Sequence, residues 1–151
     1  MRLARPWIER QSEEGSASLE FITAGMLLLL PIVYLVLTLA ALQAGAFAVE
    51  GAARQAARVY VQSGSTAEAN AAAGRAVEFA LADYGLDASD VAVEVSCSAN
   101  PCLTRRAFVT VSVSTTVTLP LVPPVLNLDV PLSIPISSTA TQQVSRFWCS
   151  R

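Results

Sequence analysis

The chain has 151 residues, of which 53% are hydrophobic and only 15% carry a formal charge. An ordinary soluble domain is about a quarter charged, so this deficit indicates that part of the chain lies in lipid. The net charge of −2 gives no support for nucleic-acid binding. The absence of histidine excludes Ser–His, Cys–His and His–metal mechanisms.

The N-terminal part combines a charged stretch with a long apolar segment. Residues 21–49 form a run of 29 without one formal charge. A helix needs about 20 residues to cross a hydrocarbon core, so this run predicts a transmembrane helix. Arginines slightly favour the N-terminal side, which indicates a cytoplasmic N-terminus. A secretory signal cleaved after Ala48 is an alternative, but the apolar run is about twice the length of such a signal.

A lone carboxylate, Glu20, stands at the start of the apolar run, five residues after Gly15. A carboxylate costs about 3 kcal/mol at the membrane centre and less at its edge. One interpretation places Glu20 in interfacial water, where the positive end of the helix dipole stabilises it. The other interpretation gives the carboxylate a specific partner.

The residues after the span continue with helical spacing. Residues 50–60 read EGAARQAARVY, with Glu50 and Arg54 four residues apart and Arg58 one turn later. This pattern predicts an amphipathic helix outside the membrane, with Glu50 and Arg54 as an exposed ion pair.

Downstream of residue 62 the pattern is that of a soluble domain. A second helix is expected over 67–84, with Ser65 or Thr66 as the N-cap and Gly85 at its C-terminal end. Three runs with a period of two, beginning at Val91, Val109 and Val130, predict half-buried strands of an antiparallel sheet. The expected fold class is α+β, with the second helix packed on the sheet. The apolar segment 120–128 either caps the sheet or contacts the bilayer or a neighbouring subunit.

The three cysteines indicate the compartment. Cys97 and Cys102 enclose a short polar loop and predict a disulfide, since a zinc site needs two more good ligands. A disulfide places the C-terminal part outside the cytoplasm. Cys149 is left over: it stays reduced, cross-links subunits or joins an alternative pairing.

No pattern for catalysis or for a cofactor is present in the sequence. Asp83, Asp87, Asp90 and Glu94 form a loose acidic cluster whose spacing matches no calcium loop, so we interpret it as a solvated turn. The hydroxyl side chains have no base partner. We therefore expect no enzyme activity, no cofactor and no metal.

Two N-terminal motifs resemble known families. Gly15, Ser16, Glu20 and Phe21, followed by a long apolar helix, resemble the type IV prepilin signature. The resemblance implies that a prepilin peptidase cleaves between Gly15 and Ser16, and that Glu20 pairs with the new N-terminal amine of a neighbouring subunit. Glu13 and Glu14 precede the cut, where that family often has Lys or Arg. The Glu50, Arg54 and Arg58 motif is similar to that of TadE-like proteins, the minor pilins or pseudopilins of the tight-adherence (Flp) pilus system.

Together these patterns predict three regions: a cytoplasmic leader at 1–15, a transmembrane helix with its extension at 16–62, and an extracytoplasmic α+β domain at 63–151. The expected function is pilus assembly through helix packing. The expected partners are a prepilin peptidase, other pilin or pilus-assembly subunits, and the lipid bilayer. The alternative is a signal-anchored extracytoplasmic binding module that is unrelated to pili.

Overall fold

The computed structural model describes residues 14–120 and 133–149. The chain divides into two compact units, Met1–Val36 and Leu37–Arg151, which we consider separately. One helix, α1 (Glu14–Gln62), contributes to both units. Most of the expected leader and of the apolar segment 120–128 lies outside the described residues.

The first unit is represented by the N-terminal part of α1. Its leucine-rich sequence favours a helix, which continues through Pro31. Among the described residues, α1 is the one helix that is long and apolar enough to cross a membrane. A candidate membrane anchor is thus present, as the sequence predicts.

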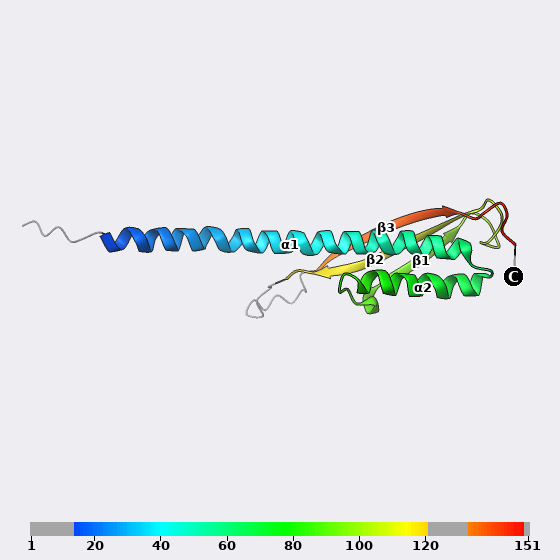
Figure 1. The fold of residues 1–151 in the computed structure, drawn as a ribbon, viewed down its shortest axis with the longest axis horizontal. Coiled ribbons are helices and arrows are strands. Elements are labelled where there is room, and N and C mark those ends of the chain that lie inside the picture. Colours follow the sequence, from blue (N-terminus) through cyan, green and yellow to red (C-terminus); the bar gives the residue numbers. More distant parts are fainter. Residues whose placement is uncertain (1–13, 121–132, 150–151) are drawn as a thin grey trace, which may run out of the picture. The chain divides into compact units, whose positions relative to one another are not determined.

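The second unit combines helices with one sheet (Figure 1). After α1 come α2 (Thr66–Ala82), the short 3₁₀ helix η1 (Ala88–Asp90), β1 (Ala92–Cys97), β2 (Phe108–Thr118) and β3 (Ser133–Gln143). The sheet is antiparallel in the order β1-β2-β3, with Val111 of β2 opposite both Val95 and Ala140. The predicted α+β class is confirmed at this level.

The ends of α2 follow local chemistry. The Ser65 side chain is the N-cap and accepts a hydrogen bond from the Glu68 backbone N–H at 3.3 Å. Gly85 takes a left-handed conformation, with φ of 69°, three residues after the helix ends. The helix itself ends at Ala82, two residues earlier than the sequence suggests.

The central strand β2 alternates strictly between two environments. Its valines at 109, 111, 113 and 117 are buried together with Thr115, whereas Thr110, Ser112, Ser114 and Thr116 lie on the opposite face. On that outer face, hydroxyl groups pair across strands, as in Thr110 with Thr141 at 2.9 Å and Ser112 with Thr139 at 3.0 Å. The strand β3 continues to Gln143, past the apolar alternation in its sequence, because β2 supplies hydrogen-bond partners along its full length.

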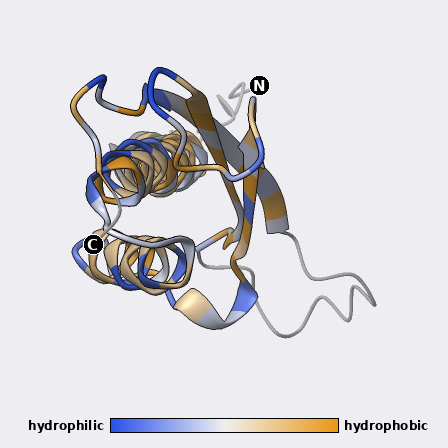
Figure 2. Cartoon of the chain, turned by 90° about the vertical axis from the view of Figure 1, so that its right-hand side faces the viewer, coloured by the Kyte–Doolittle hydropathy of each residue, from blue (hydrophilic) through white to orange (hydrophobic). Residues whose placement is uncertain are grey.

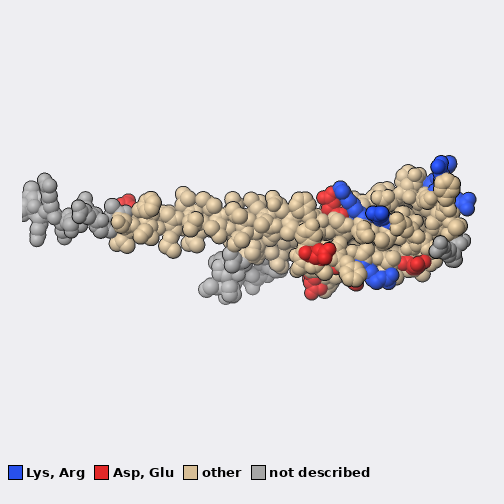
Figure 3. All heavy atoms as spheres, viewed as in Figure 1, with Lys and Arg blue, Asp and Glu red and all other residues tan. Residues whose placement is uncertain are grey.

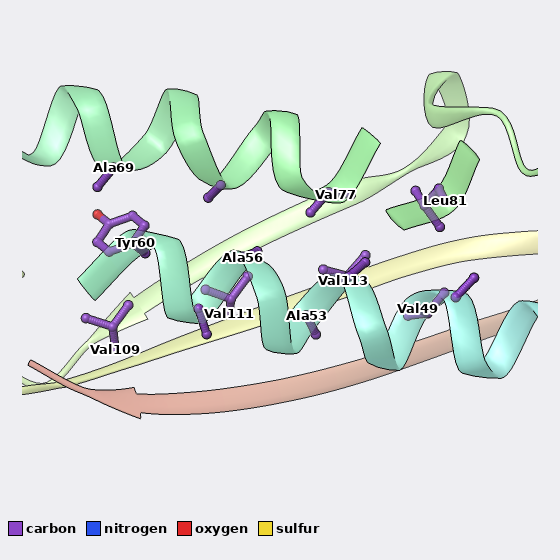
Figure 4. Close-up of a cluster of buried hydrophobic side chains, with 14 of the residues drawn as sticks. Val49, Ala53, Ala56, Tyr60, Ala69, Val77, Leu81, Val109, Val111 and Val113 are labelled. Atoms are coloured by element: carbon purple, nitrogen blue, oxygen red, sulfur yellow. The ribbon is translucent and has the colours of Figure 1, made fainter. Parts of the chain in front are cut away.

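Both α1 and α2 lie against the same face of the sheet (Figure 2). The sequence predicts this position for α2 but identifies no packing partner for the extension of α1. Figure 4 shows side chains of both helices meeting the valines of β2. The helices contribute mostly alanine to this core, and the fully buried members are Ala48, Val49, Ala52, Ala53, Ala56, Ala57, Tyr60, Ala69 and Leu81.

Candidate functional site

The N-terminal part of α1 presents an apolar surface with one charge. Phe21 is 80% exposed, and the large apolar side chains from Ile22 to Leu37 are exposed as well. An exposed apolar surface of this length is typical of a helix that lipid or another helix covers. The surface is therefore suited to a bilayer or to helix packing.

Glu20 lies on this surface in the second turn of α1. Leu19, Thr23 and Ala24 line a shallow hollow beside it. The Thr23 hydroxyl donates to the Leu19 carbonyl oxygen at 2.7 Å, so it is already engaged within the helix. No hydrogen bond or ion pair of the Glu20 carboxylate occurs within the described part of the chain, which leaves its oxygens open to a partner.

The expected processing point lies at the beginning of α1. Gly15 and Ser16 belong to the first turn, because the helix begins at Glu14. Ser16 and Glu20 are four residues apart on one helix, which places their backbones about one turn, or roughly 6 Å, from each other along its axis.

The Glu50, Arg54 and Arg58 motif divides between the surface and the core. The Arg54 guanidinium donates to the Glu50 carboxylate as an exposed ion pair, as the four-residue spacing predicts. Arg58 is exposed, whereas the alanines of the motif are completely buried. In this structure the motif serves packing: its small residues let α1 approach its neighbours.

At Gly45, α1 lies close against two side chains of the sheet. A Cβ atom built on this glycine would lie 2.5 Å from Val117 Cγ2 and 2.8 Å from Ile136 Cδ1. Both distances are shorter than ordinary contacts between carbon atoms. No sequence pattern singles out Gly45, because a glycine in an apolar run carries no sign of what it touches.

At the other end of the domain, a disulfide and the C-terminal segment stabilise the loops. Cys97 and Cys102 form the predicted disulfide, with a Cα–Cα distance of 5.2 Å, and Cys149 is free and exposed. The Trp148 indole N–H donates to the Ser63 carbonyl oxygen at 2.9 Å and so links the C-terminal segment to the turn between α1 and α2. The Arg105 Nε–H donates to the Trp148 carbonyl oxygen at 2.8 Å. These contacts join residues 43 and 85 positions apart, which no local pattern indicates.

Over residues 14–120 and 133–149, no group of three or more Cys, Asp or Glu side chains is arranged to hold a metal ion. The first unit offers an exposed apolar helix surface that carries Glu20, and the second unit is a domain with charged side chains exposed on its helices and loops. The chain matches no protein-family model, no curated protein and no solved structure.

Proposed function

We propose that this chain is a membrane-anchored assembly protein of the TadE-like kind, which a prepilin peptidase processes at Gly15–Ser16. It acts through packing of α1 against other pilin or pilus-assembly subunits and not through catalysis. The observation that carries the proposal is Glu20: it is the only charge between Ser16 and Val49, and it lies on an exposed apolar helix surface.

The charge of Glu20 carries a free-energy cost at the lipid boundary. A carboxylate at the lipid boundary is destabilised by loss of hydration, and an opposite charge nearby offsets part of that loss. Cleavage before Ser16 would create an amine about one helical turn, or roughly 6 Å along the axis, from Glu20, and a neighbouring α1 displaced by that turn brings its amine level with the carboxylate. The hollow lined by Thr23 and Ala24 beside the carboxylate leaves room for the amine of a neighbouring α1.

The disulfide supports an extracytoplasmic location for the domain. Stable disulfides persist in oxidising compartments, and Cys97–Cys102 closes a loop at the end of the domain away from Gly45. The cytoplasmic N-terminus and the single membrane crossing follow from this location together with α1.

The core argues against a secreted form cleaved after Ala48. Such a cut would fall within α1, between Ala48 and Val49, which are 0% and 1% exposed. It would place a charged amine in the apolar core, where an unpaired charge is strongly unfavourable.

The test is the N-terminal residue of the chain extracted from membranes. We expect Ser16, and we expect Gly15→Ala to leave the leader attached. Met1 in the wild-type chain would support an unprocessed tether, and Val49 would support the secreted form. An unchanged N-terminus in Gly15→Ala would refute processing at this bond.

The role of Glu20 is tested with Glu20→Gln, which keeps the shape of the side chain and removes its charge. We expect cleavage to continue, because Gly15 and Ser16 are unchanged. The amount of this chain recovered in assemblies with other subunits should fall at least tenfold. Glu78→Gln is the matched control, since it removes an exposed carboxylate on α2, outside the proposed assembly motifs. Equal assembly of Glu20→Gln and the control would contradict the proposed role.

A further inference from the structure

We propose that the second unit binds head to tail to a second copy of this chain, with its arginine end against the aspartate end of the next copy. The arginine end is Arg105, Arg106 and Arg146, and the aspartate end is Asp83, Asp87 and Asp90. The inference deepens the proposed assembly function, on which it rests, by naming the surfaces that meet.

The arginine end is formed where β2 begins and β3 ends. Phe108 pairs with Gln143, so Arg106 and Arg146, which lie just beyond these residues, are at the same end of the sheet. They line a shallow polar hollow together with Gln143, Val144 and Ser145. Figure 3 shows positive side chains gathered at one end of the domain.

The backbone holds Arg106 in a conformation that few side chains adopt. Its φ of 64° lies in the left-handed region, which costs a non-glycine residue roughly 1 kcal/mol or more. Two hydrogen bonds fix it: its N–H donates to the Val144 carbonyl oxygen, and its carbonyl oxygen accepts from the Gln143 side chain, both at 3.1 Å. The exposed guanidinium is thus carried on a fixed backbone at the rim of the hollow.

The three guanidinium groups have donors to spare. Among the described residues none of them forms an ion pair with a carboxylate. Arg105 uses Nε on the Trp148 carbonyl oxygen, and Arg146 stacks over the Phe147 ring at 4.7 Å. Glu68, near the turn that Trp148 contacts, already accepts the Gly64 N–H at 3.1 Å. Among the described residues, three arginines stand against this one carboxylate, so positive charge is in excess here, and guanidinium donors match carboxylates.

The aspartate end lies at the opposite end of β1. Asp83 follows α2, Asp87 caps η1 by accepting the Ser89 N–H at 2.9 Å, and Asp90 precedes β1 by two residues. All three are exposed, and within the described ranges none is paired with an arginine. The strand β1 has six residues and is therefore about 20 Å long. It separates the three aspartates from the disulfide loop that leads to Arg105.

These charges select the second copy and its orientation. Two arginine ends repel each other, as do two aspartate ends, whereas unlike ends attract. The same pair of surfaces then repeats from copy to copy, because a head-to-tail contact leaves one free end of each kind until a ring closes. Each exposed pair contributes at most about 1 kcal/mol, so the contact depends on several pairs together and on copies confined to one membrane.

The experiment cross-links the full chain in its membranes. Cys149 lies beside Arg105 at the arginine end, and Ser89→Cys places a thiol at the aspartate end. A short bis-maleimide should join Ser89→Cys chains into a ladder of trimers and longer species. The same variant carrying Cys149→Ser has its one reactive thiol at the aspartate end and none facing it across the contact, so it should remain monomeric.

Charge reversal then identifies the contact. In the Ser89→Cys chain, we expect Arg106→Glu with Arg146→Glu to reduce species above the dimer at least fivefold. Asp87→Arg with Asp90→Arg should have the same effect, and all four substitutions together should restore the ladder. Arg58→Glu with Arg75→Glu is the matched control, since it changes the net charge equally on the helices.

Two outcomes would overturn the inference: a ladder that persists after either reversal, or a ladder that the fourfold variant does not regain. Melting temperatures in detergent, measured for each variant, would reveal unfolding; a folded reversal variant without the ladder supports the contact. The N-terminal residue is determined on the same samples. A ladder formed by chains that begin at Met1 would refute processing and leave the contact standing, whereas chains that begin at Ser16 without a ladder would refute the contact alone.

Discussion

At Gly45, α1 and the sheet come closer than a larger residue permits. We expect Gly45→Ala to destabilise the domain by about 1–3 kcal/mol, because the new methyl group would overlap Val117 and Ile136. The loss should exceed the gain of about 0.5–1 kcal/mol that alanine brings to a helix interior. Thermal unfolding of the detergent-solubilised chain, followed by near-ultraviolet circular dichroism, measures the effect.

Gly51 provides the control for this prediction. A Cβ atom there meets nothing within 4 Å, so Gly51→Ala should stabilise the chain through helix propensity alone. Equal melting temperatures for the two variants would show that the contact at Gly45 is not tight.

For other residues of the site, the sequence predicts some contacts and not others. Ser65, Glu50 with Arg54, and Cys97 with Cys102 are recognised because their partners lie within five positions along the chain. Trp148 and Arg106 are not recognised in this way. Their partners depend on how β3 returns beside β2, and that pairing is a property of the whole sheet.

At the scale of elements, the sequence predicts the packing partner of α2 but not that of α1. Hydrophobic periodicity and caps predict both helices, but alanine is a weak indicator of burial because it occurs on helix surfaces as well. The alanine face of α1 therefore predicts a helix without identifying its neighbour. The structure shows that this face meets both α2 and the valines of β2 (Figure 4).

Close helix packing makes a specific prediction for α2. Ala73 is 2% exposed, so Ala73→Leu should introduce three carbon atoms where no space exists and destabilise the domain by about 1–3 kcal/mol. Ala71→Leu is the matched control on the exposed side of the same helix. Alanine and leucine have similar helix propensities, so a difference in urea midpoint between the two variants reports packing. Equal midpoints would argue against an alanine-packed core.

At the scale of the whole molecule, the three cysteines report which side of the membrane the domain occupies. Cys149 is exposed and free, whereas Cys97 and Cys102 are joined. We expect a membrane-impermeant maleimide to label one thiol per chain when it reaches only the extracytoplasmic side, and three after reduction and denaturation. The expected orientation requires both results, since reagent access tests the side and the disulfide tests the oxidising compartment.

A thiol in the leader gives the internal reference for this measurement. Ser12→Cys, combined with Gly15→Ala to retain the leader, should react only after the membrane is permeabilised. Labelling of Cys149 under the same restriction would place the domain in the cytoplasm and contradict the expected orientation. Labelling of both thiols from outside would mean that α1 does not cross the membrane, because a single crossing must separate residue 12 from residue 149.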